Sequence, residues 1–165
     1  MLQIMMHRSD NFFAEQVVLM ATDKILGTIN EEKGRDTIKK LIFSKLPHHF
    51  QWADGSGLSR FNLNTPENFV ATLQQMKKEF GVARIQSVFA NSVTNTIGGY
   101  YKNAPGKVYA KTGTLGNQVA LSGIINTNKG KELIFSVLVG NHINTSSAGV
   151  RKAVEQYLIK IMEQY

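Results

Sequence analysis

Three strand-like segments that follow one another closely near the C-terminal end constrain the fold of this chain most. Apolar and β-branched residues are concentrated at residues 107–113, 119–126 and 132–140. Residues 128–130, with the sequence N-K-G, are typical of a tight turn between the last two segments. Connections this short join antiparallel strands, because parallel strands need a long crossover. The sequence therefore predicts an antiparallel sheet of about three strands from the C-terminal half.

Helical patterns lie before and after the predicted sheet. Thr65, Pro66 and Glu67 supply the cap, the first-turn proline and the acid that are typical of a helix start. The order of helices, strands and a final helix predicts an α+β fold with helices packed on the sheet. The length of 165 residues suits a single domain spanning 1–165. Apolar residues recur at helical spacing in segments at about 12–26, 36–46, 65–80 and from Ser147 onwards.

Helical spacing also predicts which side chains of these helices face the interior. In the segment 12–26 the apolar stripe consists of Phe13, Val17, Met20, Ala21 and Ile25. In the last helix it consists of Val150, Val154, Leu158 and Ile161. Both stripes are expected to pack against neighbouring elements.

Composition excludes several kinds of site. The chain has no cysteine, which excludes disulfides, thiol catalysis and cysteine metal ligands. The four histidines lack metal-ligand spacing, so we expect no metal and no cofactor. The net charge of +7 is scattered, without a basic arm or a nucleic-acid-binding motif, so no nucleic-acid partner is expected. No segment reaches the roughly 20 apolar residues of a membrane span, and Arg8 and Asp10 interrupt the apolar run that a signal peptide needs.

Two tripeptides carry the chemistry that the sequence suggests. Residues 9–11 have the sequence S-D-N and lie at a predicted helix start. Residues 111–113 have the sequence K-T-G and lie at the end of a predicted strand. Alone, the first is most often a helix cap and the second an ordinary strand end. Together, in this order and on these elements, they indicate two parts of one site.

A third stretch narrows the interpretation. Residues 54–62 have the sequence D-G-S-G-L-S-R-F-N. With the S-D-N and K-T-G tripeptides, this stretch makes the chain resemble the class C penicillin-binding proteins, the branch that includes the D-Ala-D-Ala carboxypeptidase/endopeptidases. The resemblance covers nearly the whole chain. It implies that residues 1–165 are the C-terminal portion of a domain with a β-lactamase/transpeptidase-like fold.

The resemblance implies three catalytic residues in this chain. Ser9 would relay a proton to the leaving amine during acyl transfer. Asn11 would bind the substrate peptide bond and hold a lysine, since its side chain both donates and accepts hydrogen bonds. Lys111 would present a positive charge to the relay serine and to the terminal carboxylate of the substrate.

The residues that follow Lys111 are implied to bind substrate. The hydroxyls of Thr112 and Thr114 would hydrogen-bond the terminal carboxylate, and the Thr114 N–H would form half of an oxyanion hole. Gly113 would let the substrate lie close to the strand edge. The implied partners are peptidoglycan peptides ending in D-Ala-D-Ala and β-lactam antibiotics. The resemblance also implies that the protein itself is periplasmic or otherwise extracytoplasmic, although the chain contains no export signal.

The chain departs from the family pattern at the nucleophile. The S-x-x-K motif, which supplies the acylating serine and its lysine, is absent, because no serine is followed by lysine three positions later. In the family this motif precedes S-D-N, and only eight residues precede Ser9 here. The favoured interpretation is a fragment; a piece of a split protein and a homologue without the nucleophile are alternatives. We expect the missing N-terminal half or another copy to cover the edge of the strand Glu132–Gly140.

The leading functional prediction is a serine-type D-Ala-D-Ala carboxypeptidase, with endopeptidase activity on peptide cross-links as an extension. An alternative is a non-catalytic module that binds peptidoglycan peptides or a protein partner. A class A β-lactamase is a further alternative, which the sequence of residues 54–62 disfavours. Whichever enzyme it belongs to, we expect this chain alone to be catalytically incompetent, because it lacks the nucleophilic serine.

Overall fold

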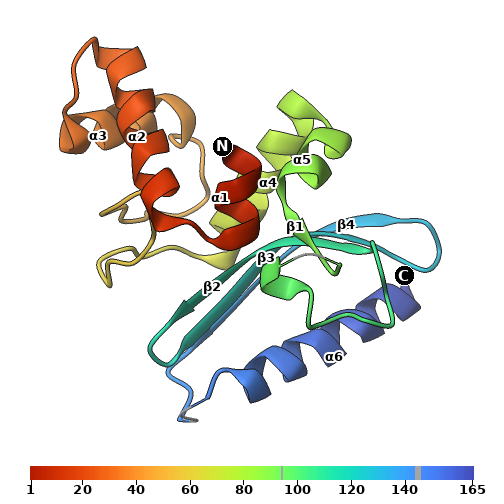
Figure 1. The fold of residues 1–165 in the computed structure, drawn as a ribbon. Helices are drawn as coiled ribbons and strands as arrows, with labels where there is room; N and C mark the ends of the chain where they lie inside the picture. The colour runs from red at the N-terminus through yellow and green to blue at the C-terminus, as the bar shows by residue number, and fades with distance from the viewer. Residues whose placement is uncertain (94, 144–145) are drawn as a thin grey trace.

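A four-stranded antiparallel sheet divides the molecule into two layers of helices (Figure 1). The computed structural model describes residues 1–93, 95–143 and 146–165. The strands follow one another across the sheet in chain order. They are β1 (Ala90–Asn91), β2 (Val108–Leu115), β3 (Gln118–Asn126) and β4 (Glu132–Gly140).

Two tight hairpins fix the register of the three long strands. Asn117, in the left-handed region with φ 59°, follows Gly116 in the connection between β2 and β3. Gly130, with φ 77°, serves the connection between β3 and β4. The resulting register places Lys111 opposite Ser122, and Ser122 opposite Ser136. These three side chains therefore share one face of the sheet, because side chains alternate along a strand.

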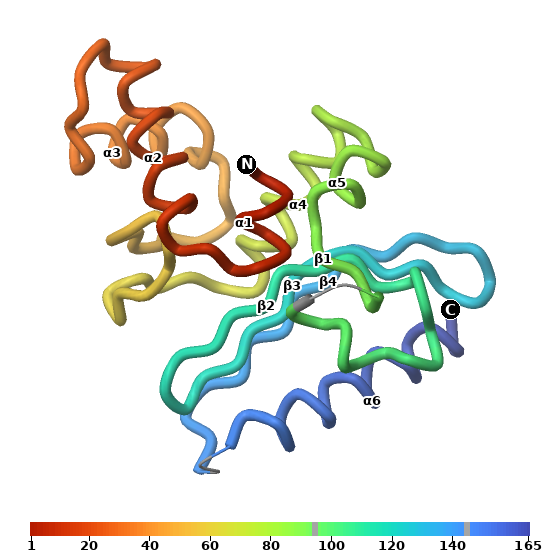
Figure 2. Tube along the Cα trace, viewed as in Figure 1, coloured from red at the N-terminus to blue at the C-terminus, as the bar shows by residue number. Residues whose placement is uncertain are grey.

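The last helix, α6 (Ala148–Gln164), covers the other face of the sheet. Its buried residues Val154, Leu158 and Met162 pack against Val108 and Ala110 of β2 and their neighbours on β3. The β3–β4 hairpin reaches the end of this helix, where the Asn128 N–H donates to the Met162 carbonyl at 2.9 Å. Figure 2 shows the C-terminus beside this hairpin.

The remaining helices lie on the opposite side of the sheet (Figure 1). Helix α4 (Pro66–Phe80) starts with Thr65 as its cap and ends at Gly81, and α5 (Val82–Val88) follows directly. Leu73 of α4 and Ile85 of α5 form a buried cluster with Phe89 and with Ile124 of β3. A short 3-10 helix, η1 (Asn95–Ile97), lies between β1 and β2 in the chain.

The three N-terminal helices lie on this same side of the sheet, and the first of them packs against α5. They are α1 (Leu2–Arg8), α2 (Asn11–Leu26) and α3 (Glu31–Ile42). Helices α2 and α3 pack closely where Gly34 faces the fully buried Thr22. A Cβ at position 34 would lie 2.0 Å from the Thr22 hydroxyl oxygen, so only glycine fits this crossing.

The α+β prediction and the antiparallel meander are confirmed, and β4 has the predicted bounds. The two-residue strand β1 was not predicted. The segment predicted at 36–46 is helical at Glu31–Ile42 instead, because Asn30 caps it by accepting the Lys33 N–H. The predicted inner stripe of α2 is partly wrong: Met20 is 59% exposed.

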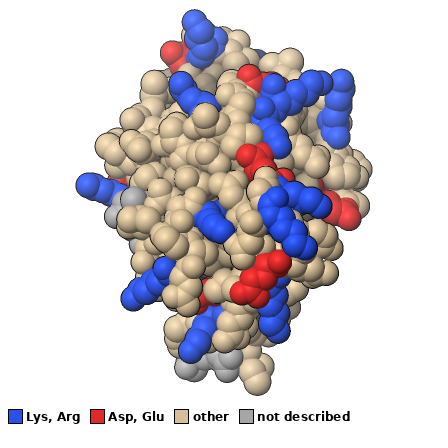
Figure 3. All heavy atoms as spheres, turned by 90° about the vertical axis from the view of Figure 1, so that its right-hand side faces the viewer, with Lys and Arg blue, Asp and Glu red and all other residues tan. Residues whose placement is uncertain are grey.

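The outer edge of β4 has no strand partner within the described residues. The expected cover for this edge therefore stays a prediction. Lys and Arg side chains lie in separate small groups over the face shown in Figure 3, with acidic side chains between some of them. No helix in the part of the chain that the structure describes is long and apolar enough to span a membrane.

Candidate functional site

Ser9 lies in the connection between α1 and α2 and is held from both sides. It has left-handed backbone angles (φ 53°, ψ 50°), and its N–H donates to the Met5 carbonyl at the end of α1. The next residue, Asp10, caps α2 by accepting the Phe13 N–H at 3.0 Å. Two helix ends therefore set the position of the Ser9 hydroxyl.

Lys111 reaches this hydroxyl from the sheet. Its Nζ donates to Ser9 Oγ at 2.5 Å and to the Thr112 carbonyl at 2.6 Å. The side chain is part-buried, and burial lowers the pKa of the Lys111 ammonium from its ordinary value. The structure thus brings together two residues that are 102 positions apart in the chain.

Asn11 does not join this contact. It is the first residue of α2, and it is exposed. Within the described residues its side chain forms no hydrogen bond to Ser9 or to Lys111. Asn11 is close to Ser9 in the chain, so it borders the Ser9–Lys111 pair without a described hydrogen bond to the lysine.

The predicted substrate-binding residues lie along a free strand edge. Strand β1 pairs only with Tyr109 and Ala110 of β2, so no described strand occupies the outer edge from Lys111 onwards. Thr112 and Thr114 point to the α6 side of the sheet, where the Thr114 hydroxyl accepts a hydrogen bond from Arg151. A Cβ on Gly113 would lie 3.2 Å from the Ala120 Cβ, so a larger residue would crowd the sheet face here.

Residues 54–62 form a loop whose polar groups hydrogen-bond to one another. The loop is also hydrogen-bonded to α2. Burial alone would raise the pKa of the Asp54 carboxyl, but hydrogen bonds from Asn62, Ser59 and Gly57 outweigh burial and lower this pKa. The loop meets α2 through Glu15, which accepts the N–H groups of Gly55 and Ser56. This loop supports the helix that begins beside Ser9.

The protein family whose pattern matches this chain is described as the D-Ala-D-Ala carboxypeptidase 3 (S13) family, and the match spans residues 1–161. The chain belongs to this S13 family. A comparison with curated proteins found no match.

Solved structures show the same fold. Penicillin binding protein 4 from Haemophilus influenzae superposes with a TM-score of 0.84 over 98% of this chain and 39% of its own, at 24% identity. A predatory peptidoglycan endopeptidase from Bdellovibrio bacteriovorus gives 0.76 over 99% of this chain and 42% of its own, at 21% identity. The TLA-1 extended spectrum beta-lactamase gives 0.62 over 95% and 62%, at 20% identity. The chain thus spans about two fifths of the length of its S13-like structural relatives.

This S13 chain contains the contact between S-D-N and K-T-G, but its 165 residues contain no S-x-x-K. Within the described residues, no group of three or more His, Asp or Glu side chains is placed to hold a metal. Ser122 of β3 lies opposite Lys111 in the register. Its hydroxyl is hydrogen-bonded to the hydroxyl of Ser136 at 2.8 Å. The arrangement places the Lys111 amine and the Ser9 hydroxyl in contact, beside an edge of β2 that no described strand occupies from Lys111 onwards.

Two arginines near the outer edge of β2 were not among the predicted site residues. Arg60, from the loop 54–62, places its guanidinium 3.0 Å from where a Cβ of Gly116 would be, at the turn that ends β2. Arg151, in the first turn of α6, contacts Thr114. The stretch at 54–62 could have drawn attention to Arg60, whereas no sequence pattern distinguishes Arg151 from the other scattered basic residues.

Proposed function

We propose that this chain supplies two walls of the active site of a serine-type D-Ala-D-Ala carboxypeptidase that acts on peptidoglycan stem peptides. The observation that carries the proposal is the 2.5 Å contact between Lys111 Nζ and Ser9 Oγ beside an unpaired strand edge. Membership of the S13 family supports it. So do the structural relatives, one of which is complexed with a β-lactam.

The free edge of β2 suits an extended peptide. A peptide that adds to a sheet edge gains main-chain hydrogen bonds, and pockets on the two faces select its side chains. At Thr112 and Thr114 the edge is free, and the hydroxyls of both residues lie on the same side. The Thr114 N–H would donate to the oxyanion that develops on the scissile carbonyl.

Ser9 and Lys111 would move the proton. Burial lowers the pKa of Lys111, so a larger fraction of its amine is neutral near pH 7 than for an exposed lysine. The neutral amine can accept the Ser9 proton when Ser9 takes a proton from the incoming nucleophile, and the ammonium so formed can return a proton to Ser9 when Ser9 protonates the leaving amine. Asn11, exposed next to Ser9, would bind the peptide from the helix side.

The acylating serine is to be supplied by residues outside these 165, since the sequence contains no S-x-x-K. We therefore expect the chain to bind peptides without hydrolysing them, in an extracytoplasmic setting where peptidoglycan is accessible. Endopeptidase action on cross-links is part of the same proposal, because one relative is a peptidoglycan endopeptidase.

The test combines covalent labelling with binding. A fluorescent penicillin should not label the full chain, whereas an N-acetylated peptide ending in D-Ala-D-Ala should bind reversibly in an NMR titration. Lys111→Ala should weaken this binding at least about tenfold, as expected for loss of a charged hydrogen-bonding group. Lys40→Ala is the matched control, since Lys40 is exposed on α3. Peptide binding that is equal in both variants would count against the proposal.

The absence of S-x-x-K also favours a second candidate, a non-catalytic module that binds peptidoglycan peptides. The coding sequence upstream of Met1 separates the two. An in-frame S-x-x-K segment, with penicillin labelling of the longer product, supports the enzyme. Binding without labelling in the longer product supports the module.

A further inference from the structure

Ser9 differs from the other serines of the described residues because its hydroxyl lies against an amine. The Lys111 Nζ is 2.5 Å from Ser9 Oγ. The other described serine hydroxyls that form hydrogen bonds contact backbone groups, a carboxylate or another hydroxyl. A serine hydroxyl is a weak nucleophile until a base takes its proton, and a lysine amine is one of the bases that proteins use for this. Ser9 is therefore the hydroxyl that this chain is best built to activate.

The surroundings of Lys111 favour the neutral amine that such a base needs. Burial lowers the pKa of the Lys111 ammonium from its ordinary value. The ion pairs formed by the described residues do not include Lys111, so no carboxylate there offsets the effect of burial. The Thr112 carbonyl accepts a hydrogen bond from the same Nζ at 2.6 Å, which fixes the amine beside Ser9.

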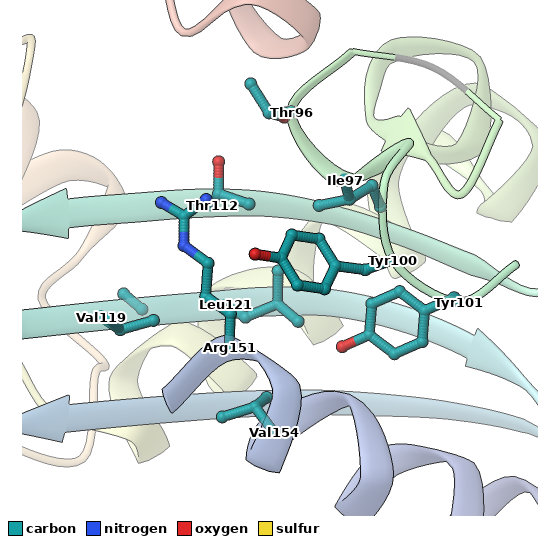
Figure 4. A pocket seen from close by; sticks show the side chains of 10 residues that line it. Thr96, Ile97, Tyr100, Tyr101, Thr112, Val119, Leu121, Arg151 and Val154 are labelled. Atoms are coloured by element: carbon teal, nitrogen blue, oxygen red, sulfur yellow. The ribbon is translucent and has the colours of Figure 1, made fainter. Parts of the chain in front are cut away.

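The Ser9–Lys111 pair is confined to one face of the sheet. Side chains alternate along β2, so the Thr112 side chain points away from the pair. Figure 4 shows Thr112 beside Arg151, on the face that α6 covers. The Thr112 hydroxyl therefore does not compete with Ser9 for the Lys111 amine.

The backbone presents Ser9 between two helices. Its φ of 53° lies in the left-handed region that residues other than glycine seldom adopt, and strain of this kind clusters at functional sites. The residue stays partly exposed, so a small reagent can reach it. Helix α2 begins two residues later, and its positive end stabilises negative charge that develops beside Ser9.

We propose that Ser9, activated by Lys111, is a nucleophile in its own right that takes up acyl groups from small activated esters. The Lys111 amine takes the proton of the Ser9 hydroxyl. The Ser9 Oγ then forms a bond to the ester carbonyl carbon, and the bond from that carbon to the leaving oxygen breaks. An aryl ester suits this step, because its aryloxide leaves without a proton. This activity goes beyond the proposed function, in which Ser9 only relays a proton.

The same chemistry limits which acyl donors react. The leaving nitrogen of an amide or a β-lactam needs a proton. In the proposed function this proton comes from Ser9, and Ser9 no longer carries it once its oxygen attacks. The chain should therefore react with activated esters and leave peptides and penicillin intact.

The test uses a fluorophosphonate with a short alkyl chain, incubated with the full chain. Attack by Ser9 forms an oxygen–phosphorus bond and releases fluoride, which also leaves without a proton. Mass spectrometry of the intact chain and of its peptides should find a single phosphonyl group, on Ser9. Ser87, an exposed serine of α5, should stay unlabelled.

Four variants assign the roles. Ser9→Ala should abolish labelling, and Ser87→Ala should leave it unchanged. Lys111→Met should slow labelling at least about 100-fold, the lower end of what a general base contributes. Lys40→Met, which removes an exposed lysine of α3, is the matched control and should label like the wild-type chain. The wild-type rate should rise with pH and level off below pH 10.5, the ordinary pKa of lysine.

The outcomes are independent of peptide binding. Absence of labelling, labelling at another residue, or equal rates in the wild-type chain and Lys111→Met overturns the inference and leaves the proposed function standing. If Lys111→Met does not fold, as judged by its melting temperature, Lys111→Arg decides, because arginine keeps the charge but cannot act as a base. Labelling of Ser9 in a chain that binds no D-Ala-D-Ala peptide supports the inference and overturns only the proposed function.

Discussion

The Glu15 carboxylate on α2 accepts the backbone N–H of Gly55 at 2.9 Å, and its second oxygen accepts the N–H of Ser56 at the same distance. These contacts attach the loop 54–62 to the helix that begins beside Ser9. A Cβ on Gly55 would lie 2.8 Å from the Ala14 carbonyl oxygen, so the loop backbone lies directly against α2. The loop and the S-D-N segment thus form one structural unit.

We predict that Glu15→Ala lowers the free energy of unfolding by about 1–3 kcal/mol, because two backbone N–H groups lose a charged acceptor. Glu15→Gln should cost less, since its amide oxygen can still accept one of the two. Urea unfolding measures both changes. Glu163→Ala is the matched control, since Glu163 is exposed near the C-terminus and should change stability little. Equal stability of the Ala variants at positions 15 and 163 would contradict the prediction.

The lowered pKa of Lys111 predicts a pH dependence of stability. The unfolded chain holds the Lys111 proton up to about pH 10.5, whereas the folded chain releases it at lower pH. Between these two pKa values the unfolded state binds more protons, so the free energy of unfolding should rise with pH. Urea unfolding from pH 7 to pH 10.5, compared with Lys111→Met, isolates this contribution. A difference between wild type and variant that does not change with pH would exclude it.

The sheet was largely predictable because local signals define its long strands. Turn residues bound β4 on both sides, and its predicted and observed limits agree. Strand β1 has no such signal: its two residues are extended because they pair with Tyr109 and Ala110 of β2. The inner face of α2 was misjudged for a similar reason. Its packing against α3 at Gly34 selects the small Thr22 rather than the larger Met20.

The site was predictable only in part. Resemblance to a family suggested Ser9 and Lys111, but no local pattern could place two residues 102 positions apart within hydrogen-bonding distance. Arg151 reaches the strand edge only because α6 crosses beneath the sheet, and that crossing is a tertiary feature. The catalytic roles of Ser9, Asn11 and Lys111 and the substrate-binding roles of Thr112, Gly113 and Thr114 all stay predictions, because the structure shows where these residues lie and not what they bind.

The crossing of α2 and α3 predicts a steric effect at Gly34. A methyl group there would meet the Thr22 hydroxyl at 2.0 Å, well inside contact distance. Overpacking of this kind costs about 1–3 kcal/mol, and the helix propensity of alanine offsets up to about 1 kcal/mol of it. We therefore expect Gly34→Ala to destabilise the chain in urea unfolding. Gly149→Ala is the matched control: nothing lies within 4 Å of its Cβ, so this substitution should be neutral or stabilising.

The unpaired edge of β4 predicts self-association of the isolated chain. An exposed strand edge offers free N–H and C=O groups to another strand. Beside this edge Val137 and Val139 line an apolar groove with Tyr157 of α6, which adds surface that water solvates poorly. Sedimentation velocity over a hundredfold concentration range should show dimers or larger species at the upper end. Val139→Lys should reduce this association, since a buried charge opposes strand pairing at the edge.

The control for the edge is Val93→Lys, because Val93 is 70% exposed in the segment after β1 and lies outside the groove. This variant should associate like the wild-type chain. If the wild-type chain stays monomeric throughout the concentration range, the outer edge of β4 does not drive self-association and the prediction is wrong. If Val93→Lys suppresses association as much as Val139→Lys does, net charge rather than the β4 edge controls it.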